Sequence, residues 1–175
     1  MTTTSSVLSK HTVTALKDVS VLLANSDSVN GRAKTVYYKS ILIILGSIVE
    51  AYLYDLVCKR CAADPTLFIK KTVELKSKTK ISKVAFGGPK QYHIAEEIIN
   101  YRTMKDVTAS FKSMNNFCRE KALVSESLYK ELEHVRKLRN TVHLQTLASH
   151  KRSYTKPMLV KITLTMFSIY VVSQK

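Results

Sequence analysis

The sequence has few of the residues that turn or break a chain. It contains four glycines and three prolines among its 175 residues. β-Sandwiches and barrels join many short strands through turns that favour these residues, so their scarcity weighs against such folds and favours long helices. A chain of this length is enough for one domain with a sizeable core and too short for two such domains.

Cysteine is scarce as well, with three residues in the chain. Three cysteines cannot form a disulfide framework. Cys58 and Cys61 are spaced C-x-x-C, but no second cysteine pair or nearby histidine completes a zinc site. We therefore expect buried or half-buried structural thiols, and neither a metal nor another cofactor.

Acidic residues are outnumbered. The chain has 13 Asp and Glu against 28 Lys and Arg, which gives a net charge of +15. Such an excess favours a polyanionic partner, because Lys and Arg gain free energy by displacing counterions from phosphates. Two alternatives remain open: the lysines only keep the surface soluble, or they face an acidic partner protein.

The chain shows no secretory or membrane signal. Its start, M-T-T-T-S-S, is polar, and its longest apolar run, Ile41 to Val57, is interrupted by Glu50 and Asp55. That run is too short and too charged for a membrane span. These features predict a soluble, cytoplasmic protein with no membrane partner.

Apolar residues recur at helical spacing over most of the chain. The strongest pattern runs from about 33 to 61, where Tyr38, Leu42, Leu45, Val49 and Tyr52 alternate at four and three residues. It predicts a central helix buried by several neighbours. Further helices are expected over residues 7–24, 92–101, 105–121, 125–147 and 154–172, with Ser125 and Ser127 as candidate N-caps.

Three segments do not fit this pattern. Residues 1–6 are expected to be a flexible tail, and residues 25–31 a loop. Residues 62–90 hold many lysines among β-branched residues and end in Gly87-Gly88-Pro89. The latter segment predicts a basic loop or short hairpin inserted into the domain. The fold expected is therefore all-α: a single-domain bundle of about five or six helices over residues 7–175.

Basic residues and a histidine gather in V-R-K-L-R-N-T-V-H, residues 135–143. On a helical wheel centred on Val135, Arg139 falls about 40° from the apolar stripe's centre. His143 falls about 80° and Arg136 about 100° from the same centre, on the same flank, and Asn140 lies slightly further round. A guanidinium beside a buried stripe needs an anionic or carbonyl partner. That partner is either an internal carboxylate, such as Glu50, Glu131 or Glu133, or a bound phosphate.

The stretch R-K-L-R-N-T-V-H-L resembles the signature of HEPN-domain proteins, which place an Arg and a polar residue a few positions before a His. The segment S-I-V-E-A-Y-L-Y-D-L-V, residues 47–57, is similar to an early helix of several HEPN groups. The resemblance covers roughly residues 33–61 and 125–172. It implies a helical bundle that forms a homodimer, with two Arg/His motifs facing one cleft.

The resemblance also implies a function. Many HEPN proteins are metal-independent endoribonucleases of toxin–antitoxin or antiphage systems, which act on tRNA or mRNA and have acidic antitoxin partners. By this resemblance Arg139, His143, Asn140 and Arg136 are catalytic, and Glu50 supports them. The histidine would move a proton at the RNA and an arginine would stabilise the charged phosphate. Lys137, Lys151 and Arg152 are expected to bind the RNA backbone.

One feature of the spacing leaves two alternatives. The family motif places four to six residues between Arg and His, whereas three lie between Arg139 and His143, and six between Arg136 and His143. Either Arg136 is the catalytic partner of His143, or the segment is a shortened version that binds RNA without cutting it. A non-catalytic nucleic-acid-binding or protein-interaction module is the second class of function.

Overall fold

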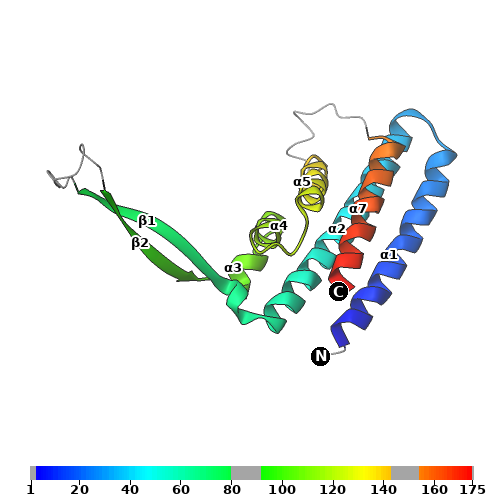
Figure 1. Cartoon of the computed structure of the whole chain (residues 1–175). Coiled ribbons are helices and arrows are strands. Elements are labelled where there is room, and N and C mark those ends of the chain that lie inside the picture. Colours follow the sequence, from blue (N-terminus) through cyan, green and yellow to red (C-terminus); the bar gives the residue numbers. More distant parts are fainter. Residues whose placement is uncertain (1–2, 80–91, 143–153, 175) are drawn as a thin grey trace.

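The computed structural model describes residues 3–79, 92–142 and 154–174. Three long helices, α1 (Thr3–Asp27), α2 (Gly31–Ala63) and α7 (Lys156–Gln174), lie side by side (Figure 1). The shorter helices α4 (Phe111–Glu120) and α5 (Glu126–Asn140) cover another side of α2. The chain is therefore a helical bundle built around α2, as the sequence predicts.

The core follows the apolar pattern of α2. This helix is buried by its neighbours along most of its length, through Tyr38, Ile41, Leu42, Leu45, Gly46, Ile48, Val49, Tyr52, Leu53, Leu56, Val57 and Cys61. Because α1, α4, α5 and α7 all pack on it, its apolar surface needs to be wider than a single stripe. Cys61 and Cys118 are buried and Cys58 partly so, all as free thiols, which agrees with their predicted structural role.

Two helices have the length and hydropathy of a membrane span. They are α2, of which 56% of the apolar window is buried inside the protein, and α7, of which 33% is buried. The apolar character of α2 is explained by its central place in the core. The apolar surface of α7 extends beyond what the core uses.

The helix expected over residues 105–121 is two helices. Ser110 accepts a hydrogen bond from the backbone N–H of Ser113 and so caps a new helix, α4. The preceding short helix, α3 (Met104–Thr108), has its own capping box between Thr103 and Asp106. Local side-chain hydrogen bonds from Ser and Thr compete with a continuous helix, and here they divide it.

The prediction of a helix over residues 92–101 is wrong. These residues form strand β2 (Tyr92–Tyr101), which pairs antiparallel with β1 (Ile69–Thr79) from Ile69 opposite Tyr101 to Thr79 opposite Tyr92. The two strands extend away from the bundle (Figure 1). The predicted insertion therefore continues to residue 101 and is a two-stranded ribbon, while residues 80–91 lie outside the described structure.

Both strands of the ribbon are attached to the bundle at its base. β1 follows α2 through the short 3-10 helix η1 (Pro65–Phe68), capped by Asp64. The Lys121 ammonium donates to the carbonyl oxygen of Ile69 at 2.6 Å. On the β2 side, Arg102 pairs with Glu120 at 2.8 Å. The base of the ribbon is thus held against the C-terminal end of α4.

Three predicted boundaries also differ. α1 begins at Thr3, so most of the expected tail at residues 1–6 is helical. The expected loop at 25–31 is shorter, because α1 ends at Asp27 and α2 begins at Gly31, whose φ of +61° favours glycine. α5 begins after its predicted N-cap Ser125 but ends at Asn140 rather than near 147.

Candidate functional site

The side chain of Arg139 crosses from α5 to α2. Its guanidinium Nη1 donates to Oε2 of Glu50, and the two side chains are about one-third exposed, at 29% and 30%. The helical wheel predicted Arg139 at the margin of the apolar stripe, with Glu50 as one candidate partner. The structure brings them together and joins the end of α5 to the middle of α2.

Gly46 explains why this contact fits. A Cβ added at Gly46 would lie 3.3 Å from Cδ of Arg139, so the arginine stem lies directly over the bare backbone of α2. Glu50 follows one turn later on the same face of the helix, where it meets the guanidinium. Our sequence reasoning missed Gly46, although an isolated glycine inside an apolar helix indicates a close approach by a neighbour.

Arg136 pairs within its own helix. Its Nη2 lies 2.9 Å from Oε2 of Glu133, and its Nε also donates to that carboxylate. Asn115 of α4, which is fully buried, donates from Nδ2 to Glu133 at 3.1 Å and to the Tyr129 carbonyl at 3.3 Å. Glu133 therefore links α4 to α5, and Asn115 was not identified from the sequence.

The Arg136 and Asn115 contacts change the ionisation of Glu133. Burial by itself would raise the pKa of this carboxyl, but hydrogen bonds from Arg136 and Asn115 and the positive charges of Arg136 and Lys137 outweigh it. The net result is a pKa below the usual value of 4.5. A pKa lowered by folding stabilises the folded state above the unfolded pKa, and this contribution is lost as the pH falls through the folded pKa.

We therefore expect the Glu133→Gln variant to lose less stability on acidification than the wild type does. Urea unfolding at about pH 6 and about pH 3 measures this difference, because glutamine cannot gain the proton that breaks the pair. Glu131→Gln is the matched control, since Glu131 pairs with no cation among the described residues. Equal acid sensitivity of wild type and Glu133→Gln would contradict the expectation.

The remaining predicted residues divide into two groups. Lys137 is exposed on the last turn of α5, and Asn140 is exposed as its final residue. His143, Lys151 and Arg152 lie outside the described residues. The position predicted for His143 required α5 to continue to about 147. That premise is wrong, because Thr141 ends the helix, with its hydroxyl donating to the carbonyl of Leu138 at 2.6 Å.

The start of the last helix is attached beside this helix end. Tyr154 is buried, and its hydroxyl lies 3.2 Å from both the hydroxyl and the carbonyl oxygen of Thr141. The ammonium of Lys39 lies 5.5 Å from the centre of the Tyr154 ring. The end of α5 is thus bounded by α2 on one side and by the segment before α7 on the other.

Metal-ligating and nucleophilic groups are the other chemistry to consider in the described residues. They contain no cluster of three or more His, Cys, Asp or Glu side chains that could hold a metal ion. Burial raises the pKa of the Cys118 thiol to about 12, so it does not form a thiolate nucleophile near neutral pH. The end of α5 itself carries two arginine–glutamate pairs and the exposed lysine Lys137.

Comparison with known proteins adds no relative to this picture. Searches of protein-family models, of curated proteins and of solved structures find no match to the chain.

Proposed function

We propose that this chain is a HEPN-like RNA-binding protein that contacts the phosphate backbone with the end of α5. The observation that carries the proposal is that the acidic side chains of the chain are mostly occupied by contacts within it. Most acidic side chains that the structure describes already pair with a cation or cap a helix: Asp27, Glu50, Asp55, Asp64, Asp106, Glu120, Glu126 and Glu133. The excess of lysines is therefore left for an external anion.

The end of α5 is the favoured contact because it combines fixed geometry with unpaired charge. The Arg139–Glu50 pair fixes this helix end on α2. Lys137 is exposed there and pairs with no acidic group among the described residues, and Asn140 follows one turn later. In the sequence, His143, Lys151 and Arg152 come next. A phosphate backbone at this end would meet Lys137.

The proposal includes metal-independent cleavage of the RNA, as the HEPN resemblance implies. His143 would take a proton from the 2′-hydroxyl or give one to the leaving oxygen, and an arginine would stabilise the phosphate. The product would carry a 2′,3′-cyclic phosphate. Toxin or antiphage activity, a cytoplasmic location and a homodimer with a shared cleft belong to the same proposal.

A second candidate is RNA binding without cleavage. It is favoured by the ion pairs, because Arg139 and Arg136 are both engaged by carboxylates of the same chain. An arginine in such a pair has to leave its carboxylate before it can hold a phosphate with both arms. In this case the two arginines shape the binding surface, and lysines supply the contacts.

Incubation with total RNA in EDTA tests the proposal. Cleavage by the wild type that is lost in His143→Ala and Arg139→Ala, with all three proteins showing equal helicity, supports the nuclease. Binding without cleavage in any RNA pool supports the second candidate. If the wild type neither binds nor cuts RNA and instead co-purifies with an acidic protein, its positive charge serves an antitoxin-like partner and the RNA proposal fails.

A further inference from the structure

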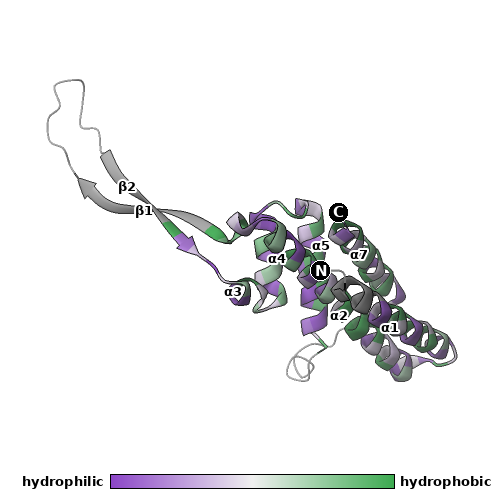
Figure 2. Cartoon of the chain, turned by 90° about the horizontal axis from the view of Figure 1, so that it is seen from below, coloured by the Kyte–Doolittle hydropathy of each residue, from purple (hydrophilic) through white to green (hydrophobic). Residues whose placement is uncertain are grey.

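The two-stranded ribbon leaves the bundle and has no helix packed along it. β1 and β2 form a sheet of two strands, and beyond the base of the ribbon the described helices do not pack on it. Figure 2 shows this base beside α3, on the side of the bundle away from α1. With its 11 residues, β1 spans roughly 35 Å. The outer end of the ribbon therefore lies far from the helical core.

Such a ribbon gains little stability from its own contacts. A hairpin of two strands is at best marginally stable in water, because it has no third strand or helix against which to bury a face. Each of its long edges also has backbone N–H and C=O groups that no further strand of the described chain covers. A long ribbon that is attached only at its base therefore indicates a surface for a partner outside the chain.

The charge of the ribbon changes along its length. Its inner part holds three glutamates and two lysines: Glu74, Glu96, Glu97, Lys70 and Lys71. Its outer part, residues 75–95, holds no acidic residue and five lysines: Lys76, Lys78, Lys80, Lys83 and Lys90. The last three of these lysines lie outside the described residues. Mixed charges would keep the ribbon soluble equally well, so charge of one sign favours a negatively charged partner.

The pairing of the two strands disfavours another β-strand as that partner. Leu75 lies opposite Ala95, and Ser77 lies opposite Ile94. Lys76, which comes between Leu75 and Ser77, is therefore an extra residue that forms a bulge in β1. Bulges and lysines on an edge strand both hinder the addition of a further strand. A partner that binds by charge, such as a phosphate backbone, fits the outer part better than an edge-to-edge sheet does.

We propose that the outer part of the ribbon is a second RNA-binding surface, whose lysines contact the phosphate backbone. The choice of RNA rests on the proposed function. The two surfaces are separate, because the ribbon is attached at the C-terminal end of α4 whereas the end of α5 is fixed on α2. An RNA long enough to reach both is held at two points, and two linked contacts bind more tightly than either alone. The substrate class is therefore long RNA.

Replacing Lys76 and Lys78 together by glutamine in the full chain tests the ribbon. The probe is a labelled single-stranded RNA of about 40 nucleotides, longer than a single site of about 4–16, and its affinity is measured by fluorescence anisotropy. The affinity is expected to fall at least about tenfold, and the slope of log affinity against log salt to shrink by about 1.4, because two contacts of about 0.7 each are lost.

Two further variants separate charge at the ribbon from other effects. Lys10→Gln/Lys17→Gln is the matched control, because both lysines are exposed on α1 and their loss changes the net charge equally. Its affinity should fall by less than about twofold. Lys76→Arg/Lys78→Arg keeps the charge and should bind like the wild type. Equal circular dichroism of all the proteins shows that they are folded.

An unchanged affinity and salt slope for Lys76→Gln/Lys78→Gln overturns the proposal, and so do equal losses for this variant and the α1 control. A loss of affinity for duplex DNA and not for RNA would assign the ribbon to DNA instead. Lys137→Glu, measured with the same RNA, separates the ribbon from the end of α5. A loss in Lys137→Glu alone leaves the α5 contact and removes the ribbon contact, whereas a loss in the ribbon variant alone does the reverse.

Discussion

Raising the salt concentration from about 50 to about 200 mM is expected to weaken RNA binding by about 1,000-fold. Each phosphate contact by a lysine or arginine releases a condensed counterion, and this gain shrinks as the bulk salt rises. Most described carboxylates are held by cations or helix caps, so the lysines that remain are the groups that would make these contacts.

Fluorescence anisotropy with a labelled single-stranded RNA over a series of salt concentrations measures this dependence. The slope of log affinity against log salt, divided by about −0.7, gives the number of phosphate contacts for a single strand. A value of about seven is expected, which corresponds to the loss of about 1,000-fold. An affinity that does not change with salt would show that the charge excess does not bind phosphates.

Replacing Glu50 by alanine is expected to lower the free energy of unfolding by about 2 kcal/mol. Breaking a partly buried ion pair costs more than breaking an exposed pair and less than breaking a fully buried one. The variant leaves the Arg139 guanidinium without its carboxylate, while the arginine stem still lies over the backbone of Gly46. Urea unfolding of both proteins at neutral pH gives the difference, and the melting temperature should fall by roughly 5 °C.

A double-mutant cycle separates the pair from its surroundings. In an Arg139→Met background, Glu50→Ala should have a smaller effect by about 1 kcal/mol, because the methionine stem keeps the packing on Gly46 without the charge. Glu131→Ala serves as the control, a glutamate without a described cation partner. Equal effects of Glu50→Ala in both backgrounds would contradict a stabilising pair.

The features predicted well from the sequence are those that depend on the residues of a single segment. The apolar pattern of residues 33–61 gives the central helix, because burial on several sides requires apolar residues around much of its circumference. Ser125 marks the start of α5, since its hydroxyl accepts a local backbone hydrogen bond from Leu128. The position of Arg139 beside the apolar stripe likewise indicated an anionic partner, either an internal carboxylate or a bound phosphate, and the structure pairs it with Glu50.

The features that were missed depend on contacts between distant segments. Residues 92–101 include Ala95, Glu96 and Glu97, which favour a helix, yet their pairing with β1 makes them a strand. Asn115 gains its role only when α4 packs on α5 and its amide meets Glu133. The end of α5 at Asn140 was missed because apolar residues continue at helical spacing beyond it.

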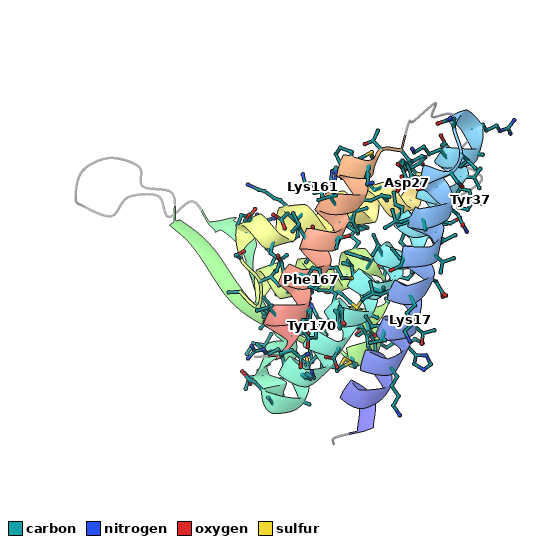
Figure 3. All side chains as sticks on the ribbon, turned by 90° about the vertical axis from the view of Figure 1, so that its right-hand side faces the viewer. Lys17, Asp27, Tyr37, Lys161, Phe167 and Tyr170 are labelled. Atoms are coloured by element: carbon teal, nitrogen blue, oxygen red, sulfur yellow. The ribbon has the colours of Figure 1, made fainter. Side chains whose placement is uncertain are left out.

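The most direct test of RNA contact at the end of α5 compares the RNA affinity of Lys137→Glu with that of Lys17→Glu. Both lysines are exposed and pair with no acidic group among the described residues, Lys137 on α5 and Lys17 on α1 (Figure 3). Both substitutions change the net charge equally. RNA contact at the end of α5 predicts a loss of at least about tenfold for Lys137→Glu and of less than about twofold for Lys17→Glu. Equal losses would contradict it, because they would show binding by overall charge alone.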